Sequence, residues 1–145
     1  MRTKVREVMT DRPRAVTPDT PVSEAARLME SEDVGALPVL DGEQLAGIVT
    51  DRDIVIRAVA GEKDPKGMPV REIASKDVAT IGPDDTLADA LKLMASAQVR
   101  RIPVVDEGNR LVGMLSQADV ALQAKEKDVG ELVEEISKPQ AGPRV

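Results

Sequence analysis

The sequence predicts an α/β (α+β) fold built from two copies of one unit, each a small sheet with two helices. The first observation is an internal repeat: Val5-Arg6-Glu7 recurs as Val70-Arg71-Glu72, an offset of 65 residues that becomes 66 by Gly47 and Gly113. The second is that each copy alternates a helical apolar pattern with short apolar runs typical of strands. Since one copy is too short to bury its own apolar face, we expect the two copies to pack on each other.

The elements of the first copy follow from its cap and turn residues. Thr20 is expected to cap a helix that has Pro21 at its first position and ends at Gly35. Further along, the apolar runs and turn residues predict, in order, a buried strand over 37–40, a hairpin turn at 41–42, a strand over 45–49 and a helix over 51–60.

The second copy repeats this order, and the stretches between and after the copies lack it. We expect a helix over 86–97, a strand over 102–105, a turn over 106–110, a strand over 111–115 and a helix over 116–125. Glycine, proline and charge without periodicity mark a linker. The expected division is a first unit at 1–60, the linker at 61–69, a second unit at 70–126, and a further amphipathic helix with a frayed tail at 127–145.

The composition excludes several classes of site. The chain has 145 residues, of which 41% are hydrophobic, and it contains no cysteine and no histidine. Disulfides, thiolate metal sites and a cysteine nucleophile are therefore excluded, as are the commonest general base and the commonest zinc ligand. No apolar run approaches the roughly 20 residues of a membrane span, and the start of the chain is charged. We expect a soluble, cytoplasmic protein with no membrane partner.

The charge balance and the lack of aromatic residues argue against nucleic acid as a partner. Twenty basic residues face 26 acidic ones, for a net charge of −6, and Phe, Tyr and Trp are all absent. Neither a basic surface nor a stacking platform for bases is available. The core must be aliphatic, with Met29 and Met94 as matched fillers, and a planar ligand would have to lie between aliphatic side chains.

One motif occurs in both copies and has two possible roles. Gly47 to Asp53 is echoed by Gly113 to Asp119, and each stretch keeps a glycine, a hydroxyl and an aspartate in register. At the start of a helix, the Thr50 or Ser116 hydroxyl and the free N–H groups can hold a phosphate, and the aspartate can accept hydrogen bonds from a ribose diol. Alternatively, both stretches are capping boxes that need no ligand.

The combined order of motifs resembles a tandem pair of cystathionine-beta-synthase (CBS) domains, often called a Bateman module. Five segments fit the family: Val5 to Thr10, Val16 to Thr20, Val34 to Val39, the stretch Gly-Ile-Val-Thr-Asp-Arg-Asp from Gly47 to Asp53, and Val99 to Asp106. The resemblance covers about residues 5–125. It implies two units packed through their strands about a pseudo-twofold axis, with two clefts between them, and a disc-like homodimer.

The resemblance also implies ligands and the residues that bind them. Family members bind adenosine-containing ligands such as AMP, ADP, ATP or S-adenosylmethionine, and NAD is a further candidate. Thr50 and Ser116 would face phosphate, while Asp53 and Asp119 would face the ribose hydroxyls. The residues expected to enclose the base by backbone and aliphatic contacts are Val16, Thr17, Pro18, Ala36, Leu37, Pro38, Thr80, Ile81, Pro83, Arg101, Ile102 and Pro103.

The two copies differ in charge near this expected site. The second copy has Arg100 and Arg101 where the first has Gly35 and Ala36. Guanidinium groups in a cleft favour a di- or triphosphate, because they make bidentate, charge-assisted bonds. We therefore expect one stronger and one weaker site. The alternative is that both arginines are solvated or pair with the surplus acids.

Three classes of function follow, in order of preference. The first is a non-catalytic sensor that binds adenine nucleotides and changes shape or oligomeric state, with an unknown protein target. The second is an interaction scaffold or stress-response protein with empty clefts. The third, an enzyme, is disfavoured because no Walker loop or activated nucleophile accompanies carboxylates such as Asp51 and Asp53. No cofactor or metal is required by the first two.

Overall fold

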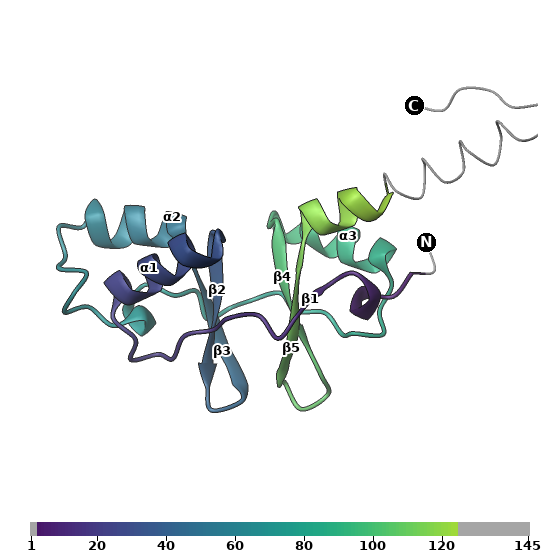
Figure 1. Ribbon diagram of the computed structural model, residues 1–145, viewed down its shortest axis with the longest axis horizontal. Coiled ribbons are helices and arrows are strands. Elements are labelled where there is room, and N and C mark those ends of the chain that lie inside the picture. Colours follow the sequence, from purple (N-terminus) through teal and green to yellow (C-terminus); the bar gives the residue numbers. More distant parts are fainter. Residues whose placement is uncertain (1–2, 125–145) are drawn as a thin grey trace, which may run out of the picture.

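Strands meet in the middle of the molecule and helices cover the outside. The computed structural model describes residues 3–124. In Figure 1 the two hairpins stand next to each other at the centre, with one group of helices flanking each of them. The mixed fold of two similar units, each with a small sheet and helices, is as the repeat predicts.

Both repeats build the same elements in the same order. The first has α1 (Val22–Glu32), β2 (Ala36–Asp41), β3 (Gln44–Thr50) and α2 (Asp51–Asp53), which continues as the π-helical η2 (Ile54–Val59). The second has α3 (Leu87–Ala97), β4 (Arg101–Val105), β5 (Leu111–Ser116) and a helix over 117–124. All eight elements expected up to residue 125 are present, although the helix after β3 is mostly π-helical rather than α-helical.

The two hairpins pair in the same register, which aligns the functional motifs. Ala36 lies opposite Thr50 in the first hairpin, and Arg101 lies opposite Ser116 in the second. Both hairpins shift register once, after Val39 and at the matching point after Val104. An equal bulge in each copy keeps the hydroxyl at the end of the second strand in the same place in both repeats.

The expected start of the first helix is wrong by one residue. Pro21 has extended backbone (φ −61°, ψ 142°) and is itself the cap residue, so α1 begins at Val22. The Thr20 hydroxyl instead accepts a hydrogen bond from the Thr17 N–H at 3.0 Å. The N–H of Val22, which has no partner within the helix, donates to the carbonyl of Met68 at 2.9 Å. The segment between the repeats therefore supplies the hydrogen-bond acceptor at the start of α1 that we expected from Thr20.

The expected end of that helix is also wrong. It ends at Glu32, and Asp33 takes the left-handed conformation (φ 54°), as Gln98 does after α3 (φ 56°). Gly35 serves another purpose, because a Cβ there would lie 2.9 Å from a carboxylate oxygen of Asp51. That glycine allows β2 to start close to the beginning of α2.

The repeats exchange their N-terminal segments. Val5, in the 3-10 turn η1 (Val5–Glu7), is fully buried in the core of the second repeat with Ile81, Leu87 and Leu115. Val70, in η3 (Val70–Glu72), is fully buried in the core of the first repeat, together with Ile73. Each hydrophobic core is therefore completed by the other copy, and residues 61–69 do not separate two independent cores.

Matched hydrogen bonds and ion pairs hold the exchanged segments. The Arg6 N–H donates to the Pro83 carbonyl at 2.9 Å, and the Arg71 N–H donates to the Pro18 carbonyl at 3.0 Å. The Arg6 guanidinium binds Asp84, and at the equivalent place the Arg71 guanidinium binds Asp19.

The same segments then cross to the opposite hairpin. The short strand β1 (Thr10–Asp11) pairs with β5, and Ser75 forms a matching bridge with Ile48 of β3. The hairpin tips also touch, through a bridge between Gln44 and Arg110. These contacts tie the two sheets together across the pseudo-twofold axis.

Two further expectations concern the C-terminal segment and the membrane. The helix and tail expected at 127–145 lie outside the described residues. Within residues 3–124, every helix is too short or too polar to cross a membrane.

Replacing Gly47 should destabilise the protein by blocking one crossing. A Cβ at Gly47 would lie 2.5 Å from the carbonyl oxygen of Ser75, and that backbone is held by two hydrogen bonds to Ile48. We expect Gly47→Ala to lower the free energy of unfolding by about 1–3 kcal/mol, measured by urea denaturation. The control is Gly67→Ala, whose Cβ would meet only the Asp64 carboxylate at 3.7 Å. Equal stability of the two variants would contradict the close approach.

The ion pair of Arg6 with Asp84 should make part of the stability depend on pH. The hydrogen bond from Arg6 lowers the pKa of Asp84 below its ordinary value of 3.8. Because the pKa is lower in the folded state, the ion pair stabilises the fold fully at a pH above the unfolded pKa. This stabilisation is lost as the pH falls from the unfolded pKa through the folded pKa. We expect the difference in melting temperature between the parent and Asp84→Asn to shrink between pH 6 and pH 3. A difference that stays constant over this range would contradict the pairing.

Candidate functional site

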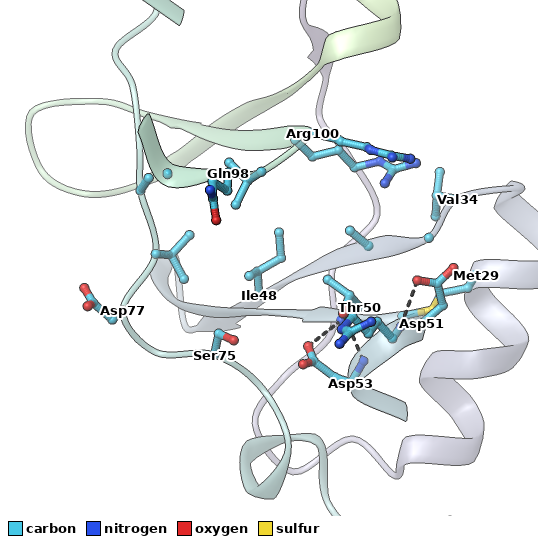
Figure 2. A pocket seen from close by; sticks show the side chains of 18 of the residues that line it. Met29, Val34, Ile48, Thr50, Asp51, Asp53, Ser75, Asp77, Gln98 and Arg100 are labelled. Carbon is cyan, nitrogen blue, oxygen red and sulfur yellow. Dashed lines mark hydrogen bonds between the residues drawn. The ribbon is translucent and has the colours of Figure 1, made fainter. Parts of the chain in front are cut away.

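A large cleft lies between the two repeats at the end of β3. This larger cleft has a volume of about 1060 Å³ and contains Thr50 and Asp53. The facing wall belongs to the second repeat and includes Arg100 and Arg101. Figure 2 shows Arg100 across the cleft from Thr50, Asp51 and Asp53, with Ile48 between the two sides.

A smaller cleft occupies the matching place at the end of β5. It has a volume of about 400 Å³ and contains Ser116 and Asp119. Its other wall comes from the first repeat and includes Arg14 and the run 36–38. Volumes of a few hundred to about 1,000 Å³ are usual for pockets that hold small molecules. Each cleft therefore combines the hydroxyl–aspartate motif of one repeat with side chains of the other.

Both hydroxyl–aspartate motifs form capping boxes. The Thr50 N–H donates to Oδ2 of Asp53 at 2.9 Å, and the Asp53 N–H donates to the Thr50 hydroxyl at 3.1 Å. The equivalent distances for Ser116 and Asp119 are 3.2 and 3.0 Å. The structural alternative raised by the sequence is thus realised in both copies.

These capping boxes leave groups that a ligand can use. Each aspartate accepts its capping bond through Oδ2, and within residues 3–124 no hydrogen bond reaches Oδ1 of Asp53 or Asp119. The Thr50 and Ser116 hydroxyls accept from the backbone but still have a proton to donate. Both motifs are half-buried. A capping role and a ligand-binding role are therefore compatible in the same residues.

The structure brings only part of the expected base-binding set to the clefts. Ala36 and Arg101 line both clefts, Arg100 lines the larger one, and Leu37 and Pro38 line the smaller one. The expected residues that line neither cleft are Val16, Thr17, Pro18, Thr80, Ile81, Pro83, Ile102 and Pro103.

The reason is that most of these residues pack or bond elsewhere. Val16 and Ile81 are buried in the two cores, and Ile102 is fully buried. The carbonyls of Pro18 and Pro83 accept hydrogen bonds from the exchanged segments, which places them at the seam between the repeats.

The segments just before these residues form the cleft walls instead. Asp77, Val78 and Ala79 line the larger cleft, and Pro13 and Arg14 line the smaller one. The two copies share no residue at these positions, where Thr10 to Arg14 matches Ser75 to Ala79. The internal repeat therefore could not identify these residues as part of a site. They reach the clefts only because the segments cross between the repeats.

The chemistry of the clefts is that of oxygen and guanidinium groups. Among residues 3–124, no three His, Cys, Asp or Glu side chains gather as a metal site. The apolar lining comes from aliphatic residues such as Val34, Ile48 and Val99. The larger cleft can accept a flat group between aliphatic side chains, a diol at an aspartate, and anionic oxygens at its arginines.

Comparison with known proteins identifies the repeats. The model of the CBS domain family matches this chain twice, over residues 5–59 and 70–125. The chain is 39% identical over 134 residues to the CBS domain-containing protein YhcV of Bacillus subtilis (strain 168), covering 92% of this chain and 94% of that one. It is 34% identical over 140 residues to hypoxic response protein 1 of Mycobacterium tuberculosis, covering 96% and 97%.

Solved structures of similar chains contain adenosine compounds. The CBS domain pair of protein MJ0100, in complex with 5′-methylthioadenosine and S-adenosyl-L-methionine, has a TM-score of 0.79 at 26% identity and covers 88% of this chain and 99% of that one. CBSX2 in complex with AMP has a TM-score of 0.74 at 28% identity, with coverages of 85% and 96%.

The structure of hypoxic response protein I carries two coordinated zinc ions, at a TM-score of 0.76 and 36% identity, covering 82% of this chain and 97% of that one. This chain contains neither cysteine nor histidine, the commonest zinc ligands, so its residues do not fit such a site. Since both repeats match the family model and the fold is that of CBS pairs, this chain belongs to the CBS domain family.

Proposed function

We propose that this protein is a non-catalytic regulatory module that binds adenosine-containing ligands of the AMP, ADP and ATP class in the clefts between its repeats. The observation that carries the proposal is the larger cleft, where Thr50 and Asp53 of one repeat face Arg100 and Arg101 of the other. The adenosine compounds bound by the MJ0100 pair and by CBSX2 support the same ligand class.

In the proposed complex, each part of the ligand meets a group suited to it. Oδ1 of Asp53 accepts from the ribose hydroxyls, while Oδ2 keeps its bond to the Thr50 N–H. The base lies among aliphatic side chains, because the chain has no aromatic residue to stack on it. S-adenosylmethionine and NAD share the adenosine part and remain candidates, and no further cofactor or metal is required.

The regulatory step follows from where the clefts lie. Each is lined by both repeats, so a ligand that fits one relative placement of the repeats better than another stabilises that placement. The ligand can shift the equilibrium only by its difference in affinity for the two placements. The output is then a change of shape read by a protein partner or by a second copy of the chain.

The alternative function is a scaffold that acts through protein partners with empty clefts. It is favoured by one observation: both capping boxes are already closed by bonds within the chain. On that view the aspartates stabilise helix starts and nothing more.

Calorimetric unfolding with and without ligands separates the two functions. A ligand at 100 times its dissociation constant adds about 2.7 kcal/mol to the stability of the folded state, which raises the melting temperature by several degrees. We expect such a rise with at least one of AMP, ADP, ATP, S-adenosylmethionine or NAD, and none with GTP. For the double variant Asp53→Ala with Asp119→Ala, we expect the rise to disappear.

The matched control is Asp89→Ala. Asp89 forms the same capping box with Thr86 at the start of α3, but it lines neither cleft. We expect each cap removal to cost about 0.5–2 kcal/mol of stability, while only the cleft variants lose the ligand-induced rise. A double variant that still responds fully to the ligand would refute the assignment of the aspartates.

We also propose that the chain forms a homodimer through the outer face of the helix following β3. Val55, Ile56 and Val59 are 54%, 52% and 63% exposed there, and Leu122 on the helix over 117–124 is 59% exposed. In Figure 1 these two helices lie along the same edge of the molecule, away from the hairpin tips. Ile56 and Leu122 occupy equivalent positions in the two repeats, and a paired apolar edge of this kind suits a second copy.

The dimer can be tested by sedimentation equilibrium. We expect the parent to have twice the 15.5 kDa mass of the chain, and Ile56→Asp to shift the mass toward that of a single chain. The control Val99→Asp alters an apolar residue that is 38% exposed at the larger cleft and should leave the dimer intact. A parent that sediments as a single chain would exclude this interface.

A further inference from the structure

The two clefts have different charged residues at equivalent positions. Arg52 lines the larger cleft, while its counterpart in the smaller cleft is Ala118. Arg100 also lines only the larger cleft, and its counterpart in the first repeat is Gly35. Arg101 lines both clefts and does not distinguish them. Two guanidinium groups are therefore specific to the larger cleft.

The arginine that is specific to the smaller cleft is already paired. Arg14 forms a salt bridge of 3.2 Å with Glu32, which lines the same cleft. The counterparts of these two residues in the larger cleft are Ala79 and Ala97, so the pair has no equivalent there. Because Glu32 satisfies Arg14, an incoming phosphate would have to compete with a carboxylate for it.

The arginines of the larger cleft have no such partner. Within residues 3–124, neither Arg52 nor Arg100 forms a salt bridge. Four carboxylates also line this cleft. Oδ1 of Asp51 accepts from the Arg52 N–H at 2.8 Å and Oδ2 of Asp53 accepts from the Thr50 N–H, while Asp33 and Asp77 form no salt bridge within residues 3–124. Arg100 lies on the opposite side of the cleft from Asp51 and Asp53 (Figure 2). Both guanidinium groups are thus available to anionic oxygens.

We infer that the two clefts select different members of the adenosine class, an inference that rests on the proposed function. The larger cleft takes a nucleotide with a phosphate chain, held by Arg52 and Arg100. The smaller cleft takes an adenosine compound without a phosphate chain, because it lacks both of these guanidinium groups and Arg14, the arginine specific to it, is paired with Glu32. The module therefore responds to two kinds of ligand at once, and each can alter the affinity for the other through the shared walls formed by Ala36 and Arg101.

Isothermal titration calorimetry with ATP and with adenosine tests the division. For the parent we expect one ATP site per chain. For Arg52→Ala with Arg100→Ala we expect the dissociation constant for ATP to rise about tenfold or more, because each charge-assisted bond to phosphate is lost, while adenosine binding stays unchanged. The control Arg14→Ala should leave ATP binding as it is in the parent.

A gain-of-function variant completes the test. Ala118→Arg places a guanidinium in the smaller cleft at the position of Arg52, and we expect it to raise the ATP stoichiometry toward two per chain. The exposed position of Ala118 on the helix over 117–124 accommodates the longer side chain. Circular dichroism melts of all variants confirm that each is folded at the titration temperature.

The outcomes separate this inference from the proposed function. The division between the clefts is wrong if the parent binds two ATP molecules with equal affinity. It is also wrong if Arg14→Ala weakens ATP binding as much as the double variant does. In both cases the proposed binding of adenosine compounds still stands. If the dissociation constants for ATP and for adenosine rise equally in the double variant, Arg52 and Arg100 do not bind the phosphate chain. If the parent binds no adenosine compound at all, the proposed function fails and the division fails with it.

Discussion

The N-terminal segment of each repeat is buried in the other repeat, and this exchange holds the two cores together. Val5 and Val70 are each fully buried in the core of the opposite repeat, so neither core is complete without the other copy. A fully buried valine contributes about 1.5–3 kcal/mol relative to an exposed one. This exchange joins the two repeats, and it carries the chain past the opposite hairpin, where it forms one wall of each cleft.

The clefts therefore arise from the crossing rather than from either repeat alone. Thr50 and Asp53 stand at the end of β3, but their cleft is closed by residues 77–79, which follow the crossing segment. The equivalent crossing brings Pro13 and Arg14 to Ser116 and Asp119. Each cleft is therefore lined by both repeats, and this is the arrangement on which the proposed regulatory step depends.

The hydroxyl–aspartate motif shows how one set of residues can serve both fold and ligand. Asp53 closes the first turn of α2 through one carboxylate oxygen and leaves the other toward the cleft. Asp89 makes the same capping box at α3 but lines neither of the two clefts. The motif alone therefore cannot identify a binding site. The tertiary position of the cap decides whether its second oxygen has anything to bind.

The helices, strands and hairpin pairings could be predicted from the residues alone, because they depend on local patterns that occur in both repeats. The hairpins, both capping boxes and the arginine difference between the copies were all predictable from residues near one another in the chain. The tertiary structure was needed to place the bonds of Pro18 and Pro83, since their partners, Arg71 and Arg6, lie in the exchanged segments. The tertiary structure also shows that Arg14 is paired with Glu32, which lies 18 positions away in the chain. The equivalent residues of the second repeat are both alanine. Long-range contacts of this kind leave no periodic trace in the sequence, so the walls of the clefts had to be found in three dimensions.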